Sequence, residues 1–309
     1  MPKKWSMVPY EKRLPDSQYQ DALRLLLKSK EKQEKTWQGH PTYSCYCSIS
    51  MRFNLKYGAP LITERKVSFW RAAIGEIFAF INGARTQSEL VEKWGCKWWQ
   101  DWVTAKKCAD FGLEPGDLGP GSYGAAFHDF PTSEGKTFNQ FENIVEKIRD
   151  RPFEKTHVIT PWIPQYAIKR YIGKEEEERK VVVAPCHGWL YFWVTGNKQK
   201  RLNMCMTQRS ADFPVGVPAN MIQYAALLMA MAQVCDLEPG EFVHSFWDAH
   251  FYEKQRAYIR KIIRREPRPL PTLTITDQSI KNIFDFRPEH FAITDYHPHP
   301  AIPDIPVLI

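Results

Sequence analysis

Residues 202–234, with the sequence LNMCMTQRSADFPVGVPANMIQYAALLMAMAQV, decide the fold. The first seven of these residues predict a short strand, 202–208, and an apolar helix begins near Asn220. The apolar part of that helix, 221–234, is too short to span a bilayer and is closed by Asp236. We therefore expect a strand followed by a helix that is buried in the core of a protein.

The segments on either side predict long helices mixed with short strands. Helices are expected at residues 18–35, 68–80, 137–149 and 251–264, and strands at 43–55, 157–160, 181–183, 189–195 and 272–275. A long Gly- and Pro-rich loop is expected at 112–130, and a solvated turn at 173–180. This mixture is typical of an α+β fold rather than of a repeating β-α-β chain.

The composition bounds the size and the class of the protein. Of its 309 residues, 43% are hydrophobic and 14% are aromatic, which is enough for one large core. Because no Ser/Gly linker or low-complexity tract divides the chain, we expect one domain over residues 1–309. The formal net charge of +7 indicates acidic partners, either nucleic acid or small anionic ligands, or an ordinary solvated basic surface.

Seven cysteines, an odd number, argue against a disulfide framework. There is no C-x-x-C pair with the spacing of zinc ligands, so we expect no metal. The first residues, MPKKWS, lack the apolar stretch of a signal peptide. We therefore expect a reduced, soluble, cytoplasmic protein without a membrane segment.

Several short motifs follow one another in a fixed order along the chain. They are GEIFAFING (75–83), GDLGP (116–120) with Tyr123-Gly124, PCH (185–187), QRSAD (208–212), GVPAN (216–220), DAHFY (248–252), REPRP (265–269), YHPHP (296–300) and PVLI (306–309). Each motif is weak by itself, but their shared order covers most of the chain. In this order the sequence resembles the thymidylate synthase family.

The resemblance implies one α+β domain with a large mixed β-sheet and packed helices, usually assembled as a homodimer. It also implies a reaction in which Cys186 adds to C6 of a uracil nucleotide. The C5 carbon of uracil becomes a nucleophile only after such an addition. C5 then takes the one-carbon unit of 5,10-methylenetetrahydrofolate, so that dUMP becomes dTMP and dihydrofolate is released.

A thiolate requires a positive charge close by, because a free cysteine titrates at about 8.5. Arg209 is the candidate for that charge, and the matching family arginine also contacts the phosphate. Glu76 resembles the family's general acid/base, since a buried carboxylate has a raised pKa. Tyr123 resembles the residue that helps to remove the C5 proton. Asn220 matches the residue that pairs with the base, and an asparagine there favours uracil; it is also a candidate helix N-cap.

Further binding residues are carried over from the same motifs. The catalytic set is completed by Asp212. The substrate contacts expected from the resemblance are Arg209, Gln208, Ser210, Asp212, Asn220, His250, Tyr252, His187 and Lys155. The folate contacts expected are Trp99, Asp212, Gly216, Glu76 and Ile309. For Trp99, plain packing in the core is the alternative interpretation.

The match breaks at the phosphate site, where the family usually has four arginines, two of them from the other subunit. Only Arg209 is retained; the expected pair reads Lys155-Thr156, and another position reads Gln38. A charge-assisted hydrogen bond contributes about 1.5–3 kcal/mol. Either Lys155 and other basic groups rebuild the site, or the substrate is not the ordinary monophosphate.

Changes near the expected folate pocket leave two other activities open. One residue is inserted between Pro120 and Tyr123, and Ala79, His128 and Pro214 replace or stiffen common family positions. A reshaped pocket leaves hydroxymethylation of a pyrimidine nucleotide open as the alternative, whereas the retained Trp99 and the family-like C-terminal residues favour methylation. A catalytically weak relative that binds nucleic acid through its basic run, 254–268, is the third hypothesis, and steep salt dependence would identify it.

Overall fold

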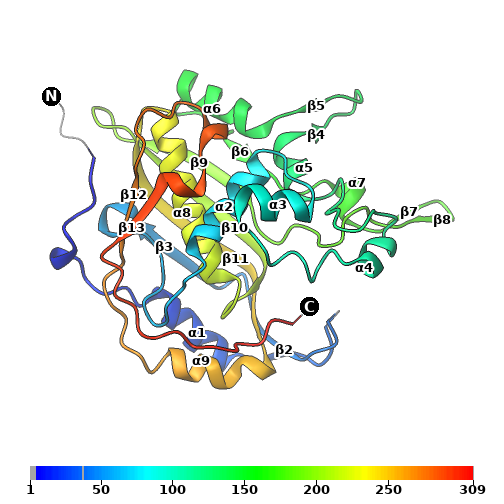
Figure 1. Ribbon diagram of the computed structural model, residues 1–309, viewed down its shortest axis with the longest axis horizontal. Coiled ribbons are helices and arrows are strands. Elements are labelled where there is room, and N and C mark those ends of the chain that lie inside the picture. Colours follow the sequence, from blue (N-terminus) through cyan, green and yellow to red (C-terminus); the bar gives the residue numbers. More distant parts are fainter. Residues whose placement is uncertain (1–4, 37, 309) are drawn as a thin grey trace.

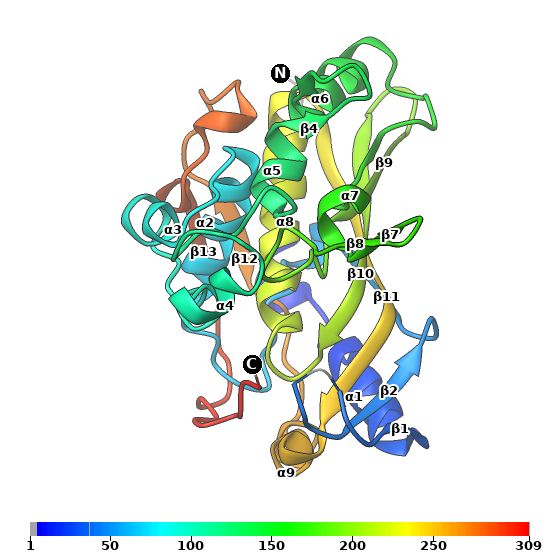
Figure 2. The same ribbon diagram turned by 90° about the vertical axis from the view of Figure 1, so that its right-hand side faces the viewer.

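The computed structural model describes residues 5–36 and 38–308, and these fold into three layers. Helix α8 (Val217–Val234) lies in the middle, with the main sheet on one side of it and α2 (Trp70–Ile81) on the other. Figure 2 shows this order, with α3 (Gln87–Trp94) and a small sheet on the same side of α8 as α2. The α+β class and the large mixed sheet expected from the sequence are confirmed.

Within the described residues the main sheet has seven strands in the order β1-β2-β11-β10-β9-β6, with β3 also paired to β11. The strands are β1 (Glu31–Gln33), β2 (Thr42–Tyr46), β3 (Ser50–Asn54), β6 (Val158–Ile159), β9 (Trp189–Thr195), β10 (Arg201–Asp212) and β11 (Glu238–Tyr252). Among the strands of the part of the chain that the structure describes, only β10 and β11 pair in parallel, and α8 connects them. This β-α-β unit places the C-terminal ends of β10 and β11 beside the first turn of α8.

Helix α8 is the centre of the core because it is apolar on every side. Nearly all of its residues are buried, and Leu227, Leu228 and Met231 are fully enclosed. It is long and apolar enough to cross a membrane by composition alone, but 89% of that stretch is buried inside the protein. A helix with apolar residues all round is stable in water only when other elements cover it, as the sheet and α2 do here.

The remaining elements cover the far side of α8 and the lower end of the sheet (Figure 1). They are α1 (Gln18–Lys28), α4 (Ala105–Ala109), α5 (Tyr123–His128), α6 (Gln140–Asp150), α7 (Pro164–Ala167) and α9 (Arg256–Ile262), with the hairpins β4–β5 (Phe130–Pro131, Thr137–Phe138), β7–β8 (Arg170–Ile172, Glu175–Glu177) and β12–β13 (Thr272–Ile275, Phe291–Thr294). Gly75 allows α2 and α3 to approach closely, because a Cβ there would lie 2.3 Å from the Trp94 carbonyl oxygen.

Strong local patterns gave correct element predictions. The strands predicted at 189–195 and 272–275 coincide with β9 and β12. The apolar helix near Asn220 is α8, and the helix predicted at 68–80 is α2.

Four predicted elements differ from the structure. The helix predicted at 18–35 ends at Lys28, beyond which there is no apolar residue to bury, and 31–33 become the edge strand β1. The strand predicted at 43–55 is broken at Cys47, whose φ of 52° turns the chain between β2 and β3. The helix predicted at 251–264 begins only at Arg256, because β11 runs on to Tyr252, where Phe251 and Tyr252 pair with β2. The predicted strand 181–183 is a buried, irregular segment.

The long loop predicted at 112–130 contains α5, which carries Tyr123. Gly124 lets this helix lie against the chain at Ala84, since a Cβ would be 2.1 Å from the Ala84 carbonyl oxygen. The turn predicted at 173–180 is largely exposed, as expected, and contains β8, the second strand of the hairpin β7–β8.

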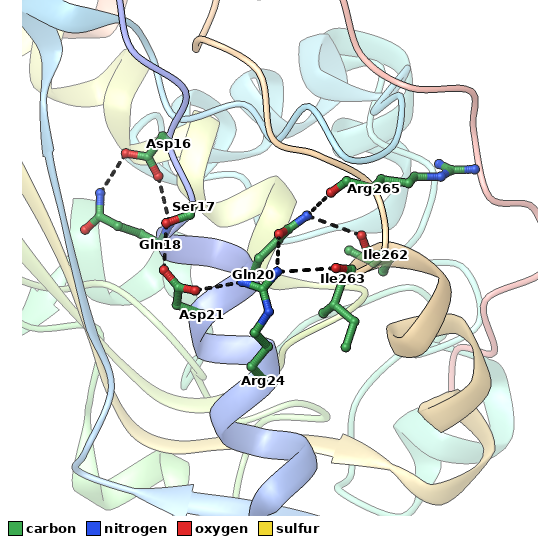
Figure 3. A network of polar contacts seen from close by, with 9 residues as sticks. All are labelled: Asp16, Ser17, Gln18, Gln20, Asp21, Arg24, Ile262, Ile263 and Arg265. Carbon is green, nitrogen blue, oxygen red and sulfur yellow. Dashed lines mark hydrogen bonds and ion pairs between the residues drawn. The ribbon is translucent and has the colours of Figure 1, made fainter.

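Helices α1 and α9 are held together by the polar network in Figure 3. The buried Gln20 side chain donates through Nε2 to the carbonyl oxygens of Ile262 (3.3 Å) and Arg265. Arg24 donates to the Gln20 side chain (2.9 Å) and to Asp21 (2.7 Å). Gln20 therefore satisfies carbonyls at the end of α9 that have no partner within the helix.

The buried carboxyl of Glu64 makes the fold sensitive to pH. Burial raises the pKa of Glu64 to about 7, although backbone N–H groups of Glu64 and Thr63 act against this. A glutamate in an unfolded chain titrates near 4.3, so the folded state holds the proton more tightly. The free energy of unfolding therefore falls as pH rises from about 4.5 to 7, by about 3 kcal/mol in total.

We predict that Glu64→Gln removes this pH dependence. Between pH 4.5 and 7.5 the wild type should lose about 3 kcal/mol of unfolding free energy that the variant does not lose. The stability of the variant relative to the wild type should therefore rise by this amount. Urea denaturation at several pH values measures it. Glu175→Gln, at an exposed hairpin position, controls for the loss of one carboxylate. An equal difference at both pH values would contradict the prediction.

Candidate active site

Cys186 lies beside β10, in contact with Arg209. The Cys186 carbonyl oxygen accepts from the Arg209 N–H (2.7 Å), which fixes the two residues side by side. The Arg209 guanidinium donates to the carbonyl oxygens of Pro185 (3.1 Å) and Ala184 (3.2 Å) and reaches within 3.6 Å of Cys186 Sγ. The pair expected from the sequence is therefore assembled.

Two opposed effects act on the Cys186 thiol. Burial raises its pKa, and the positive charge of Arg209 lowers it, but burial is the larger effect. Arg209 thus acts in the direction expected from the sequence without making the thiol acidic. The thiol form is favoured until a group accepts its proton.

Tyr123, on α5, holds the backbone on the other side of the cysteine. Its hydroxyl oxygen accepts from the N–H of Cys186 (2.6 Å) and from that of His187 (3.4 Å). The ring is stacked between Phe80 and His187, with centroid distances of 4.8 and 4.6 Å. Burial raises the pKa of Tyr123 well above its ordinary value. The phenol therefore keeps its proton and can donate it.

His187 is a buried, neutral ring in the wall of the site. Its Nδ1 lies 2.7 Å from the hydroxyl of Tyr224 on α8. Burial lowers the pKa of His187 to about 3. The ring therefore links the Cys186 segment to the core helix and carries no charge.

Glu76, on α2, is a buried carboxylate surrounded by donors. Trp98 and Trp99 donate their indole N–H groups to its Oε1 (2.6 and 2.7 Å), and Gln223 donates to its Oε2 (3.0 Å). Burial raises the pKa of Glu76, while these hydrogen bonds lower it. The raised pKa suits a group that takes up and returns a proton. Trp99 is buried beside Glu76, and its expected stacking on folate stays a prediction.

Asn220 and Gln208 face each other between α8 and β10. Gln208 Nε2 donates to the side-chain oxygen of Asn220 (3.1 Å) and to the carbonyl oxygen of Ser210 (3.2 Å). Asn220 Nδ2 donates to the side chain of Gln223 (2.9 Å). Sequence reasoning missed Gln223, although an isolated amide one turn after Asn220 in an apolar helix was a usable signal.

Asp212 lies at the end of β10 and is tied to the C-terminal segment. Gln255 Nε2 donates to both carboxylate oxygens of Asp212 (3.1 and 3.0 Å) and to the carbonyl oxygen of Pro306 (2.9 Å). Burial raises the pKa of Asp212 to about 6, against the charge of His250 and the bond from Gln255. Ile309, an expected folate contact, lies outside the described residues.

The ends of β10 and β11 bring the remaining expected residues together. Asp212 is the register partner of His250, whose Nδ1 lies 3.4 Å from an oxygen of Asp248. Tyr252 packs edge-on against His250, and burial raises the pKa of Tyr252 to about 12. Gly216, rather than Asn220, is the N-cap residue of α8, and its carbonyl oxygen accepts from the Asn220 N–H (3.1 Å) within the first turn.

Lys155 lies apart from this group. It is exposed and borders a hollow of about 440 Å³ on the outer face of the sheet, together with Arg52, Phe153, Tyr191 and Trp193. Within one chain the structure does not bring Lys155 to Cys186.

Arg179 is a second cation near the site that sequence reasoning missed. Its guanidinium lies 4.4 Å over the ring of Phe111 and donates to the Val182 carbonyl oxygen (3.1 Å). Burial lowers the pKa of Arg179, and the positive charge of Arg209 lowers it further, while Glu178 raises it. The acidic residues before Arg179 predict a solvated turn. The half-buried position of Arg179 was therefore not expected from the sequence. Among the described residues, no group of three or more His, Cys, Asp or Glu side chains is placed to hold a metal.

Comparison of the whole chain with models of protein families gives a match to the family described as thymidylate synthase. The match covers residues 17–307 of the 309 residues, and therefore includes every described residue of the site above.

We predict that Arg209→Gln slows the alkylation of Cys186. Removal of a positive charge 3.6 Å from Sγ raises the pKa of the thiol further, so less thiolate is present at pH 7.5. The rate with iodoacetamide, followed by mass spectrometry, should fall about tenfold or more. Arg209→Lys, which keeps the charge, should fall less, and Arg52→Gln on the outer face is the control. Alkylation of Arg209→Gln at the wild-type rate would contradict the role of Arg209.

Proposed function

Because this chain belongs to the thymidylate synthase family, we propose that it transfers a one-carbon unit from 5,10-methylenetetrahydrofolate to C5 of dUMP, releasing dTMP and dihydrofolate. Members of the family are enzymes that bind a nucleotide and a folate. The observation that carries the proposal is the contact between Cys186 and Arg209, next to an asparagine amide with free hydrogen-bonding groups.

We assign the following roles to the chain's own residues. Cys186 gives up its proton and adds through Sγ to C6 of the base, while Arg209 stabilises the thiolate. Asn220 binds the edge of the base, and Glu76 exchanges a proton with O4. Tyr123, whose oxygen lies 2.6 Å from the Cys186 nitrogen, stays protonated and orients a water molecule that accepts the C5 proton. Folate supplies the carbon and the hydride, and Asp212 and Trp99 are its proposed contacts.

For the phosphate we propose that Arg179 joins Arg209. The hydrogen bonds of both guanidinium groups go to carbonyl oxygens of residues 182–185 and to Cys186 Sγ, so neither charge is neutralised by these contacts. The charge of Arg209 lowers the pKa of Arg179, and a dianion placed between the two half-buried guanidinium groups would offset this repulsion. Arg179 would then compensate in part for the family arginines missing at Gln38 and Lys155.

We predict that the wild type releases tritium from [5-³H]dUMP only when methylenetetrahydrofolate is present. Mass spectrometry should identify dTMP and dihydrofolate, and UMP, dCMP, CMP and deoxyuridine should react more slowly. Cys186→Ala should abolish release, because C5 is not activated without addition at C6. Cys47→Ser, an exposed cysteine on the turn after β2, is the matched control. A hydroxymethylated product, or faster release from another nucleotide, would overturn the assignment of substrate and product.

We also propose that the protein acts as a homodimer joined through the outer face of the sheet. Trp247 is 44% exposed there and packs on Trp189 (5.0 Å between centroids), which packs on Trp162 (5.9 Å). Trp162 in turn lies 5.4 Å from the Arg209 guanidinium. An exposed aromatic surface of this kind is typical of an interface, and this one leads directly to the active-site arginine.

We predict that Trp247→Glu gives a monomer with greatly reduced activity. A charge buried without a partner in an interface of two-fold symmetry is introduced twice. Light scattering after gel filtration measures the mass, and tritium release measures the activity. Phe138→Glu replaces an equally exposed aromatic outside the sheet and should change neither. A Trp247→Glu protein with the wild-type mass would contradict the proposed interface.

A further inference from the structure

Five buried polar side chains form one continuous row through all three layers of the fold. His244 Nε2 lies 2.9 Å from Oε1 of Gln208, whose Nε2 donates to Asn220. Asn220 Nδ2 donates to Gln223, and Gln223 Nε2 donates to Glu76. The row begins on β11, passes through β10 and α8, and ends on α2. Gln223 and His244 have no role in the function proposed above.

Two contacts of the Gln208 amide, with Ser210 and with His244, set the direction of the row. The Ser210 carbonyl oxygen can only accept, and it accepts from Gln208 Nε2 (3.2 Å). The amide nitrogen of Gln208 must therefore face Ser210 and Asn220, and its oxygen must face His244. Rotation of the Gln208 amide by 180° would place two oxygens against each other in a buried site.

His244 supplies the donor that this arrangement requires. Since Gln208 Oε1 can only accept, the proton of the imidazole must be on Nε2. Burial lowers the pKa of His244 well below its ordinary value, so the ring is neutral and its Nδ1 carries no proton. The ring is held between Phe246 and Phe242, with centroid distances of 4.1 and 5.7 Å.

The fixed direction decides what Asn220 offers to a ligand. Its oxygen uses one lone pair for Gln208, and its nitrogen uses one N–H for Gln223, so one lone pair and one N–H are left. These match the N3–H and the C4 carbonyl of uracil. In cytosine N3 carries no proton and C4 carries an amino group. Cytosine would therefore need the opposite orientation of the Asn220 amide.

Turning Asn220 around cannot occur alone. Its N–H groups would face those of Gln208, and its oxygen would face the oxygen of Gln223. Reversal of the whole row would require a protonated Glu76 at one end and a Gln208 oxygen facing the Ser210 carbonyl at the other. Each contact between two oxygens or between two N–H groups leaves a buried group without its partner.

We propose that His244 is a positioning residue that, through Gln208, holds the Asn220 amide in the orientation selective for uracil over cytosine. The proposal rests on the proposed function only in taking Asn220 as the residue that binds the base. Gln223 fixes the same orientation from the Glu76 end.

The test compares His244→Phe with His244→Gln. Phenylalanine keeps a flat ring between Phe242 and Phe246 but cannot donate to Gln208, whereas a glutamine amide can place a donor near the position of Nε2. Dissociation constants for dUMP and dCMP are measured by calorimetry without folate, so that binding is separated from turnover. The tautomer of His244 is read in the wild type from long-range ¹H–¹⁵N spectra, assigned by the signals that His244→Phe loses.

We expect the Nε2–H tautomer in the wild type and a preference for dUMP. In His244→Phe the ratio of the two dissociation constants should shift about five- to tenfold towards dCMP, the effect of one hydrogen bond, and His244→Gln should retain most of the preference. Gln223→Met cuts the row at its other end and should produce a similar shift, so the test holds even if His244→Phe does not fold.

An Nδ1–H tautomer would overturn the proposal whatever the enzyme binds. An unchanged ratio in folded His244→Phe and Gln223→Met, with dUMP still preferred, would also overturn it and would leave the proposed function intact. A wild type that binds neither nucleotide would overturn the proposed function and, with it, the selectivity assigned to His244.

Discussion

The row of hydrogen bonds from His244 to Glu76 is the constraint on which the site and the core both depend. Its members are buried, and a buried polar group without a partner costs about 1–3 kcal/mol. Because β11, β10, α8 and α2 each contribute to it, the row closes only when all four elements are in their native register. The apolar faces of α8 and the sheet supply the free energy of burial, but they tolerate small shifts. The polar row does not, and it therefore specifies how the layers align.

Around Cys186, the same burial that excludes water works against ionisation of the thiol. Arg209 opposes this effect but does not outweigh it. A thiol that ionises only partly before the substrate binds is protected from adventitious oxidation and alkylation. Closure of the site by a bound nucleotide would remove further water and strengthen the attraction between Arg209 and the thiolate, because charges interact more strongly at low dielectric. Activation of the nucleophile then follows from substrate binding.

The sequence was sufficient where local pattern and tertiary role agree. The apolar run of α8 and the alternation in β9 predict their elements, and the ordered motifs place Cys186, Arg209, Tyr123 and Asn220 in one family arrangement. It was insufficient where a contact is made by residues far apart in the chain. The end of strand β11 was predicted as part of a helix, because Phe251 and Tyr252 are held extended by pairing with β2, which is distant in the sequence. His244, Gln223 and Arg179 carry no motif, and their positions became meaningful only when the fold brought them to Gln208, Glu76 and Arg209.

Arg179 and Arg209 are the proposed phosphate ligands in a chain that lacks most of the family's phosphate-binding arginines. Arg179 and Arg209 donate to backbone carbonyl oxygens, and each lies over an aromatic ring, Phe111 and Trp162. Carbonyl oxygens and ring faces are weak partners for a guanidinium compared with a carboxylate or phosphate. Two like charges held near each other in partly buried positions destabilise the free protein, and an anion that contacts both relieves this cost on binding. Because Trp162 also belongs to the aromatic surface formed with Trp189 and Trp247, a subunit docked there would exclude water from Arg209 and strengthen its hold on that anion. Assembly and phosphate recognition would then depend on the same side chains.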